Sequence, residues 1–157
     1  MSLIRIITWL QETSLAQFLD GPRYISMTIQ IFHIVGFVAL LAIIVALNVR
    51  VQKLAFRSLP VASFVKSLVR SYYIALAMAL VAGVLLFLPR GVAYGANRPF
   101  DLKIVLLLAA IALQFLLHHY ISRHEGHEAS ALVRAGAALT LVVWFVVGGT
   151  GGAIGFV

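Results

Sequence analysis

The chain has 157 residues and a net charge of +7, with 62% hydrophobic and only 11% charged residues. A soluble domain is usually about half apolar and roughly a quarter charged, so this composition excludes an ordinary cytosolic enzyme, a disordered chain and a coiled coil. It predicts an integral membrane protein, and the length leaves room for four or five helices of ~20 residues.

The N-terminal residues 2–19 predict an amphipathic helix that lies in the membrane interface. Apolar residues recur at helical spacing on one of its faces, as expected for a helix that rests on lipid. These residues are Leu3, Ile6, Ile7 and Leu10. The tripeptide Asp20-Gly21-Pro22 then ends this helix, because glycine and proline interrupt helical backbone.

Apolar stretches long enough to cross a hydrocarbon core of ~30 Å follow in the rest of the chain. They cover residues 25–49, 72–88, 102–120 and 131–157. We therefore expect an all-α fold: a single membrane domain over residues 1–157, built as a four-helix bundle with an N-terminal interfacial helix.

The loop between the first two spans is strongly basic and predicts the orientation. It carries Arg50, Lys53, Arg57, Lys66 and Arg70 and no acidic residue. The positive-inside rule places such a loop in the cytoplasm. We expect a multi-pass protein of the bacterial inner membrane with both termini in the periplasm. Basic residues beside apolar spans indicate contact with the lipid bilayer, and we expect no nucleic-acid partner.

Polar residues inside the spans are the candidate site, because hydrocarbon makes them costly. His33 shares a face of the first span with Gln30, and Lys103, Gln114 and His118 form a stripe along the third. Histidines on two spans suggest the ligation of a b-type haem.

The depths of the two histidines weaken the simplest form of this prediction. Spans one and three run in the same direction, and the depths of His33 and His118 differ by ~12 Å at 1.5 Å per residue. One haem held by both histidines of one chain therefore fits poorly. A haem with one histidine, two haems, a ligand from a partner subunit and a hydrogen bond to a neighbouring helix all stay open.

Histidines also gather at the cytoplasmic end of the third span. They are His118, His119, His124 and His127. If the helix continued, His124, His127 and Glu128 would share a face at spacings of three and four residues, and such a set could bind a divalent metal ion. Gly126 interrupts the segment, so a solvated polar loop is the competing interpretation.

The loop before the third span combines basic and aromatic residues. Tyr94, Arg98 and Lys103 form a rim near His33 that could hold haem propionates, a quinone head group or lipid phosphate, or could simply anchor the chain at the interface. In the fourth span, Gly148 and Gly152 have the spacing that favours close helix packing.

Several short motifs, spread along nearly the whole chain, resemble those of a known protein family. They are His33-Ile34-Val35-Gly36, Asn48-Val49-Arg50, Arg57, Gly83, the series Tyr94, Asn97, Phe100 and Lys103, and His118. With these motifs the chain resembles a family of small four-span bacterial inner-membrane proteins. It is distantly similar to the membrane domain of copper-resistance D proteins and to the haem-containing protoporphyrinogen oxidase of bacteria. That family commonly has Asp-Leu-Arg where this chain has Asn48-Val49-Arg50. The resemblance implies haem, copper or redox chemistry carried by His33 and His118.

The sequence thus favours a redox-linked membrane subunit that binds b-type haem or quinone. The alternatives are a non-catalytic accessory or anchor subunit of a larger membrane complex or homo-oligomer, and a small transporter of metal ions or protons. The chain has no cysteine, which excludes thiolate metal sites, iron–sulfur clusters and c-type haem attachment. No hydrolase, transferase or nucleotide-binding motif is present, so no catalytic residue is assigned.

Overall fold

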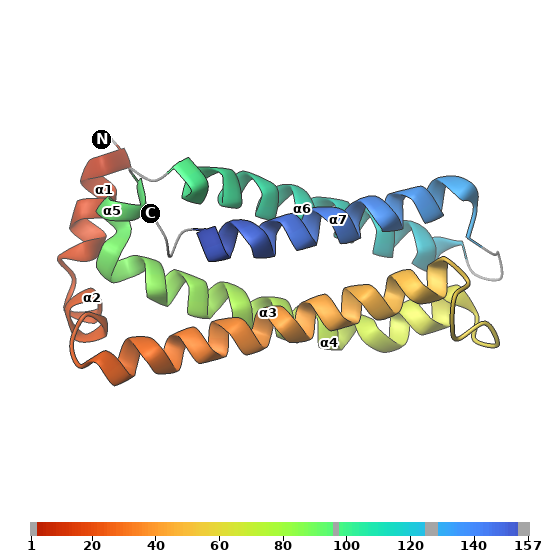
Figure 1. The fold of residues 1–157 in the computed structure, drawn as a ribbon, viewed down its shortest axis with the longest axis horizontal. Helices are drawn as coiled ribbons and strands as arrows, with labels where there is room; N and C mark the ends of the chain where they lie inside the picture. The colour runs from red at the N-terminus through yellow and green to blue at the C-terminus, as the bar shows by residue number, and fades with distance from the viewer. Residues whose placement is uncertain (1–2, 96–97, 125–128, 154–157) are drawn as a thin grey trace.

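The computed structural model describes residues 3–95, 98–124 and 129–153, and this part of the chain is helical without strands (Figure 1). Its long helices are α3 (Arg23–Val51), α4 (Val61–Phe87), α6 (Arg98–Arg123) and α7 (Ala131–Ala153). Within the described residues, four helices are long and apolar enough to cross a membrane. The expected all-α membrane bundle is confirmed.

The bundle consists of two antiparallel helix pairs packed side by side. Helix α3 packs mainly on α4, and α6 packs mainly on α7; the contacts of α3 with α7 and of α4 with α6 join the pairs (Figure 1). Helices α1 and α5 and the last turn of α7 lie at one end, called the α1 end. The α3–α4 connection and the end of α6 lie at the opposite end, called the loop end.

The N-terminal segment forms two short helices where the sequence predicts one. Helix α1 covers Leu3–Gln11 and α2 covers Ser14–Leu19. The Thr13 hydroxyl accepts a hydrogen bond from the Ala16 amide at 3.3 Å and so caps α2, which explains the break. Helix α1 crosses the end of the bundle almost at right angles to the long helices (Figure 1).

The connection between α4 and α6 is more ordered than its turn-forming composition indicates. A short 3₁₀ helix, η1, covers Leu88–Arg90, and α5 covers Gly91–Gly95. Helix α1 packs on both, and the amide of Val92 donates a hydrogen bond to the Gln11 side chain at 3.2 Å. The N-terminal segment is therefore docked on the bundle.

Helix α4 begins before the second predicted span. Helix α4 begins at Val61 rather than near Tyr72, so Lys66 and Arg70 lie on the helix and not in a loop. Pro60, directly before it, cannot continue the preceding chain as a helix but suits a helix start. Long basic side chains can reach water from a helix end, so charge alone is a poor marker of a helix boundary in a membrane.

Apolar side chains fill the bundle in two layers. The first, closer to the α1 end, contains Leu40, Ile44, Tyr72, Ala75, Leu76, Ala110, Trp144 and Val147. The second, at the loop end, contains Leu47, Val51, Val61, Ala62, Val65, Ile121, Val133 and Ala137. Large apolar side chains also remain exposed along the outer faces of the long helices, such as Ile74, Leu108 and Val142. These are the surfaces that contact the lipid bilayer.

Candidate functional site

His33 is held in one orientation by the helix next to it. Its Nδ1 atom lies 2.8 Å from the backbone carbonyl oxygen of Ala79 on α4. A carbonyl only accepts, so Nδ1 carries the ring proton and Nε2 keeps its lone pair. A Cβ atom at Gly83 would lie 3.1 Å from His33 Cε1, so this glycine leaves the room that the ring occupies.

Lys103 approaches the same part of the bundle from α6. Its side chain is half-buried, and it lies close enough to His33 for the two to interact electrostatically. A Cβ atom at Gly151 of α7 would lie 3.1 Å from Lys103 Nζ. We call His33, Lys103, Gly83 and Gly151 the His33 site; it joins all the long helices near the α1 end.

A second polar group lies deeper in the bundle and is called the core polar cluster. It consists of Tyr72 on α4, Gln114 and His118 on α6, and Trp144 on α7, none more than 5% exposed. The Gln114 amide nitrogen donates to His118 Nε2 at 2.9 Å. The Tyr72 ring packs edge-on against His118 with 5.0 Å between ring centroids. Trp144 packs in the same core layer as Tyr72.

Each side chain of the core polar cluster has a buried polar atom with no hydrogen-bond partner among the described residues. These atoms are Tyr72 Oη, Gln114 Oε1, His118 Nδ1 and Trp144 Nε1. Because His118 Nε2 accepts from Gln114, its proton is on Nδ1. The cluster therefore presents indole and imidazole N–H donors, an amide acceptor and a hydroxyl that can do both.

His33 and His118 lie at different depths. His33 is level with Ala79 and His118 is level with Tyr72, and these two α4 residues are about two turns apart. At 1.5 Å per residue the levels differ by ~10 Å. The structure thus agrees with the mismatch expected from the sequence and does not bring the two histidines together as ligands of one haem iron.

The other residues predicted to bind a cofactor are distributed unevenly. Gln30 lies one turn before His33 on α3 and is exposed. Tyr94 stacks with Phe100 and Phe87 at the α1 end, with ring centroids 5.3 and 6.2 Å apart. Arg98 begins α6, but its side chain lies outside the described residues.

The histidines predicted to bind a metal ion lie in separate environments. His118 is buried in the core, whereas His119 is exposed and stacks on Phe115 at 6.0 Å. His124 stacks on Tyr120 at 4.1 Å. His127 lies outside the described residues. In the part of the chain that the structure describes, no three His, Cys, Asp or Glu residues could hold one metal ion.

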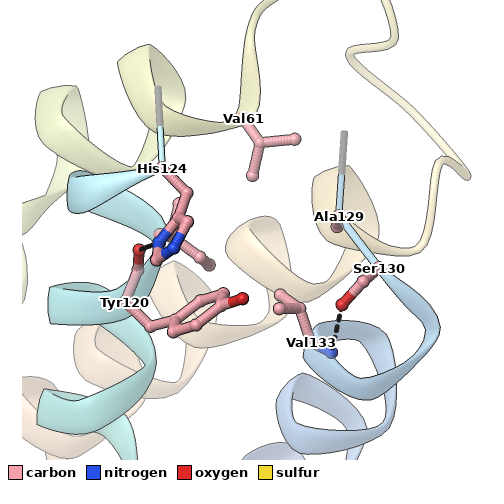
Figure 2. A pocket seen from close by; sticks show the side chains of 7 residues that line it. Val61, Tyr120, His124, Ala129, Ser130 and Val133 are labelled. Atoms are coloured by element: carbon pink, nitrogen blue, oxygen red, sulfur yellow. Dashed lines mark hydrogen bonds between the residues drawn. The ribbon is translucent and has the colours of Figure 1, made fainter. Parts of the chain in front are cut away.

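A small pocket of about 200 Å³ opens at the loop end between α4, α6 and α7 (Figure 2). Its lining residues are Val61, Tyr120, Ile121, His124, Ala129, Ser130 and Val133. His124 Nδ1 lies 2.8 Å from the Tyr120 carbonyl, and the Ser130 hydroxyl accepts from the Val133 amide at 3.3 Å (Figure 2). The pocket is smaller than typical ligand sites of 300–1,000 Å³.

Two buried residues were not predicted as site or structural residues. Tyr72 marked only the expected start of the second span. Arg50 was counted only as loop charge, yet it is 2% exposed and its Nε donates to the Leu59 carbonyl at 2.6 Å. The run of Ala75, Leu76 and Ala79 after Tyr72 is a signal that could have indicated a closely packed interior face.

Comparisons of the chain with protein-family models, curated proteins and solved structures gave no match. The resemblance to a family of four-span inner-membrane proteins remains a prediction from the sequence motifs.

Proposed function

We propose that this integral membrane protein is a redox-linked subunit that binds a b-type haem through one axial histidine, His33. The orientation of its ring carries the proposal. Histidines that bind metals usually donate their second ring N–H to a carbonyl or carboxylate, which fixes the ring and leaves the other nitrogen free to ligate. The bond from His33 Nδ1 to the Ala79 carbonyl has this form.

The free Nε2 of His33 favours haem over quinone. The carbonyl oxygen of an oxidised quinone accepts hydrogen bonds, and so does the free Nε2 of His33, so the two do not pair. A haem iron takes the lone pair of Nε2, and the Lys103 ammonium can pair with a propionate. Haem bound there would supply one-electron transfer, and the chain's own part is to orient the imidazole and place the cation.

His118 is a weaker candidate for the axial ligand. Its Nε2 accepts the Gln114 amide and its Nδ1 carries the proton, so neither nitrogen offers a lone pair. This chain would therefore provide a single histidine, His33, to the haem.

We further propose that the loop end faces the cytoplasm of a bacterial cell, which puts both termini and the His33 site on the periplasmic side. The basic residues at the loop end support this orientation. Electrons for the haem would come from a membrane quinone or a partner subunit.

The transporter alternative has less support. Transport along the polar stripe of α6 would require a polar path between Lys103 and Gln114. Three residues between them, Leu107, Ala110 and Ile111, pack into the apolar core instead. The accessory-subunit alternative does not require His33 to bind a ligand. The experiment below distinguishes it from the haem proposal.

The absorption spectrum of the purified protein tests the proposal. We expect a Soret band, present as isolated or after addition of haemin, that His33→Ala abolishes because the axial nitrogen is lost. The matched control is His119→Ala, which removes an exposed histidine of the same chain and should leave the band unchanged. Size-exclusion chromatography and circular dichroism check that both variants remain folded.

A colourless protein that takes up no haemin would contradict the proposal and support the accessory-subunit alternative. A band that persists in folded His33→Ala but disappears in His118→Ala would move the ligand to the core polar cluster.

A further inference from the structure

The core polar cluster combines deep burial with unpaired hydrogen-bonding atoms. The exposed fractions of its four side chains run from 0% for Gln114 to 5% for His118. Burial of a polar atom without a partner costs a large part of the free energy of a hydrogen bond, and hydrocarbon around the bundle offers no replacement. Four such side chains in one region of the core need partners that the described residues do not supply.

The chemistry of these atoms defines that partner. Trp144 Nε1–H and His118 Nδ1–H can only donate, Gln114 Oε1 can only accept, and the Tyr72 hydroxyl does either. The partner must therefore both donate and accept hydrogen bonds. Apolar residues such as Leu40, Ile44 and Ala110 pack around the cluster, so the partner must also be very small.

We propose that the core polar cluster binds ordered water in the interior of the membrane. A buried water molecule typically makes about three hydrogen bonds to otherwise unpaired groups. The cluster provides that number of partners from α4, α6 and α7. The proposal is independent of haem binding at His33, which lies ~10 Å away along the bundle.

We expect this water to exchange slowly with the solvent, because apolar side chains enclose the cluster. The apolar layer at the loop end separates it from that surface, with Leu47, Val65 and Ile121 among its buried residues. Toward the α1 end, Phe37 packs against Trp144 with ring centroids 6.3 Å apart. The Asn48 side chain, on the loop-end side of the cluster, has a further buried oxygen without a hydrogen-bond partner among the described residues. Water reaches the cluster when the helices briefly separate, and it then stays.

Nuclear magnetic resonance on the full chain with ¹⁵N-labelled tryptophan tests this directly, with water itself as the probe. The chain has two tryptophans, and Trp9→Phe assigns their indole signals. We expect a cross-peak between Trp144 Nε1–H and the water resonance, although the Trp144 ring is only 1% exposed. Trp9, which is 63% exposed, is the positive control for solvent exchange.

A matched pair of tyrosine variants gives a second readout. Tyr72→Phe removes a hydroxyl that would bind the water, so it should weaken the Trp144 cross-peak and lower the Tm by about 2–4 °C. Tyr73→Phe removes the same group from the neighbouring, exposed ring and should change neither. Both variants conserve side-chain volume, so packing is retained.

Two results would overturn the proposal. One is a Trp144 indole without a water cross-peak in a sample where the Trp9 signal exchanges. The other is a Tm of Tyr72→Phe equal to or above that of the unsubstituted protein, which is the result expected when the deleted hydroxyl has no partner.

Discussion

Gly36 decides how closely α3 and α4 approach each other. A Cβ atom at this position would lie 2.8 Å from the backbone nitrogen of Ala79 and 3.2 Å from its Cα. Backbone atoms of a packed helix cannot rotate away as a side chain can. Any side chain at position 36 therefore pushes the helices apart at the residue whose carbonyl orients His33.

We expect Gly36→Ala to lower the free energy of unfolding by about 1–3 kcal/mol, the usual cost of overpacking. It should also weaken haem retention, because the Ala79 carbonyl moves relative to the His33 ring. Thermal unfolding followed by circular dichroism measures the first effect, and haemin titration measures the second.

Gly149→Ala is the control, since a Cβ atom there meets nothing within 4 Å. This variant should be as stable as the unsubstituted protein or slightly more so, because alanine is a better helix former than glycine. Equal stability of the Gly36 and Gly149 variants would show that the α3–α4 contact tolerates a methyl group.

At the scale of single residues, the sequence predicted those polar groups whose presence in a span is unusual. His33, Gln114 and His118 stand out because ionisable and amide side chains are costly in hydrocarbon. Tyr72 did not stand out, because aromatic residues are ordinary in membrane helices. Its role depends on which atoms of other helices it faces, and sequence spacing on one helix carries no such information.

At the scale of helices and their connections, Arg50 links the end of α3 to the α3–α4 loop. Its side chain is 2% exposed, and its Nε donates to the carbonyl of Leu59, directly before the proline that precedes α4. Lys53 and Phe56 in the same loop have positive φ angles of 62° and 55°, so the turn is tight. A buried arginine that binds the loop backbone stabilises this turn.

Arg50→Lys should destabilise the protein by about 1.5–3 kcal/mol, because an ammonium group lacks the planar donor pattern of the guanidinium and leaves a charge-assisted hydrogen bond unmade. Arg57→Lys is the matched control, since Arg57 is exposed in the same loop. Chemical unfolding of the two variants side by side measures the difference. The idea fails if both variants unfold at the same denaturant concentration.

The positions of helices were predictable where the length of an apolar stretch alone sets them. They were less predictable where charged residues or a capping side chain set the end of a helix. The first and third predicted spans lie inside α3 and α6, and α7 covers the described part of the fourth. Helix α4 begins before the second predicted span, since it also contains Lys66 and Arg70. These two residues were assigned to a loop, although both are good helix formers. The N-terminal segment was predicted as one helix from its hydrophobic periodicity. The periodicity does not show that the Thr13 side chain caps a second helix.

At the scale of the whole molecule, the proposed orientation has a direct test. The chain has no cysteine, so a single introduced thiol reports on one position. Ser58 in the α3–α4 loop and Glu12 between α1 and α2 are both exposed. With the loop end in the cytoplasm, a membrane-impermeant thiol reagent should label Glu12→Cys in intact spheroplasts and Ser58→Cys only after lysis. The opposite pattern would invert the orientation and place the His33 site in the cytoplasmic half.

The sequence by itself determined that this is an all-helical membrane protein, because its apolar stretches have the length that a helix needs to cross a bilayer. It also determined the set of polar residues from which any site must be built. Only the tertiary structure decided that His33 and Lys103 form one group, while Gln114 and His118 form another with Tyr72 and Trp144. The physical reason is that helix rotation and relative depth are set by close contacts such as Gly36 on Ala79, and these contacts couple residues that the chain keeps far apart.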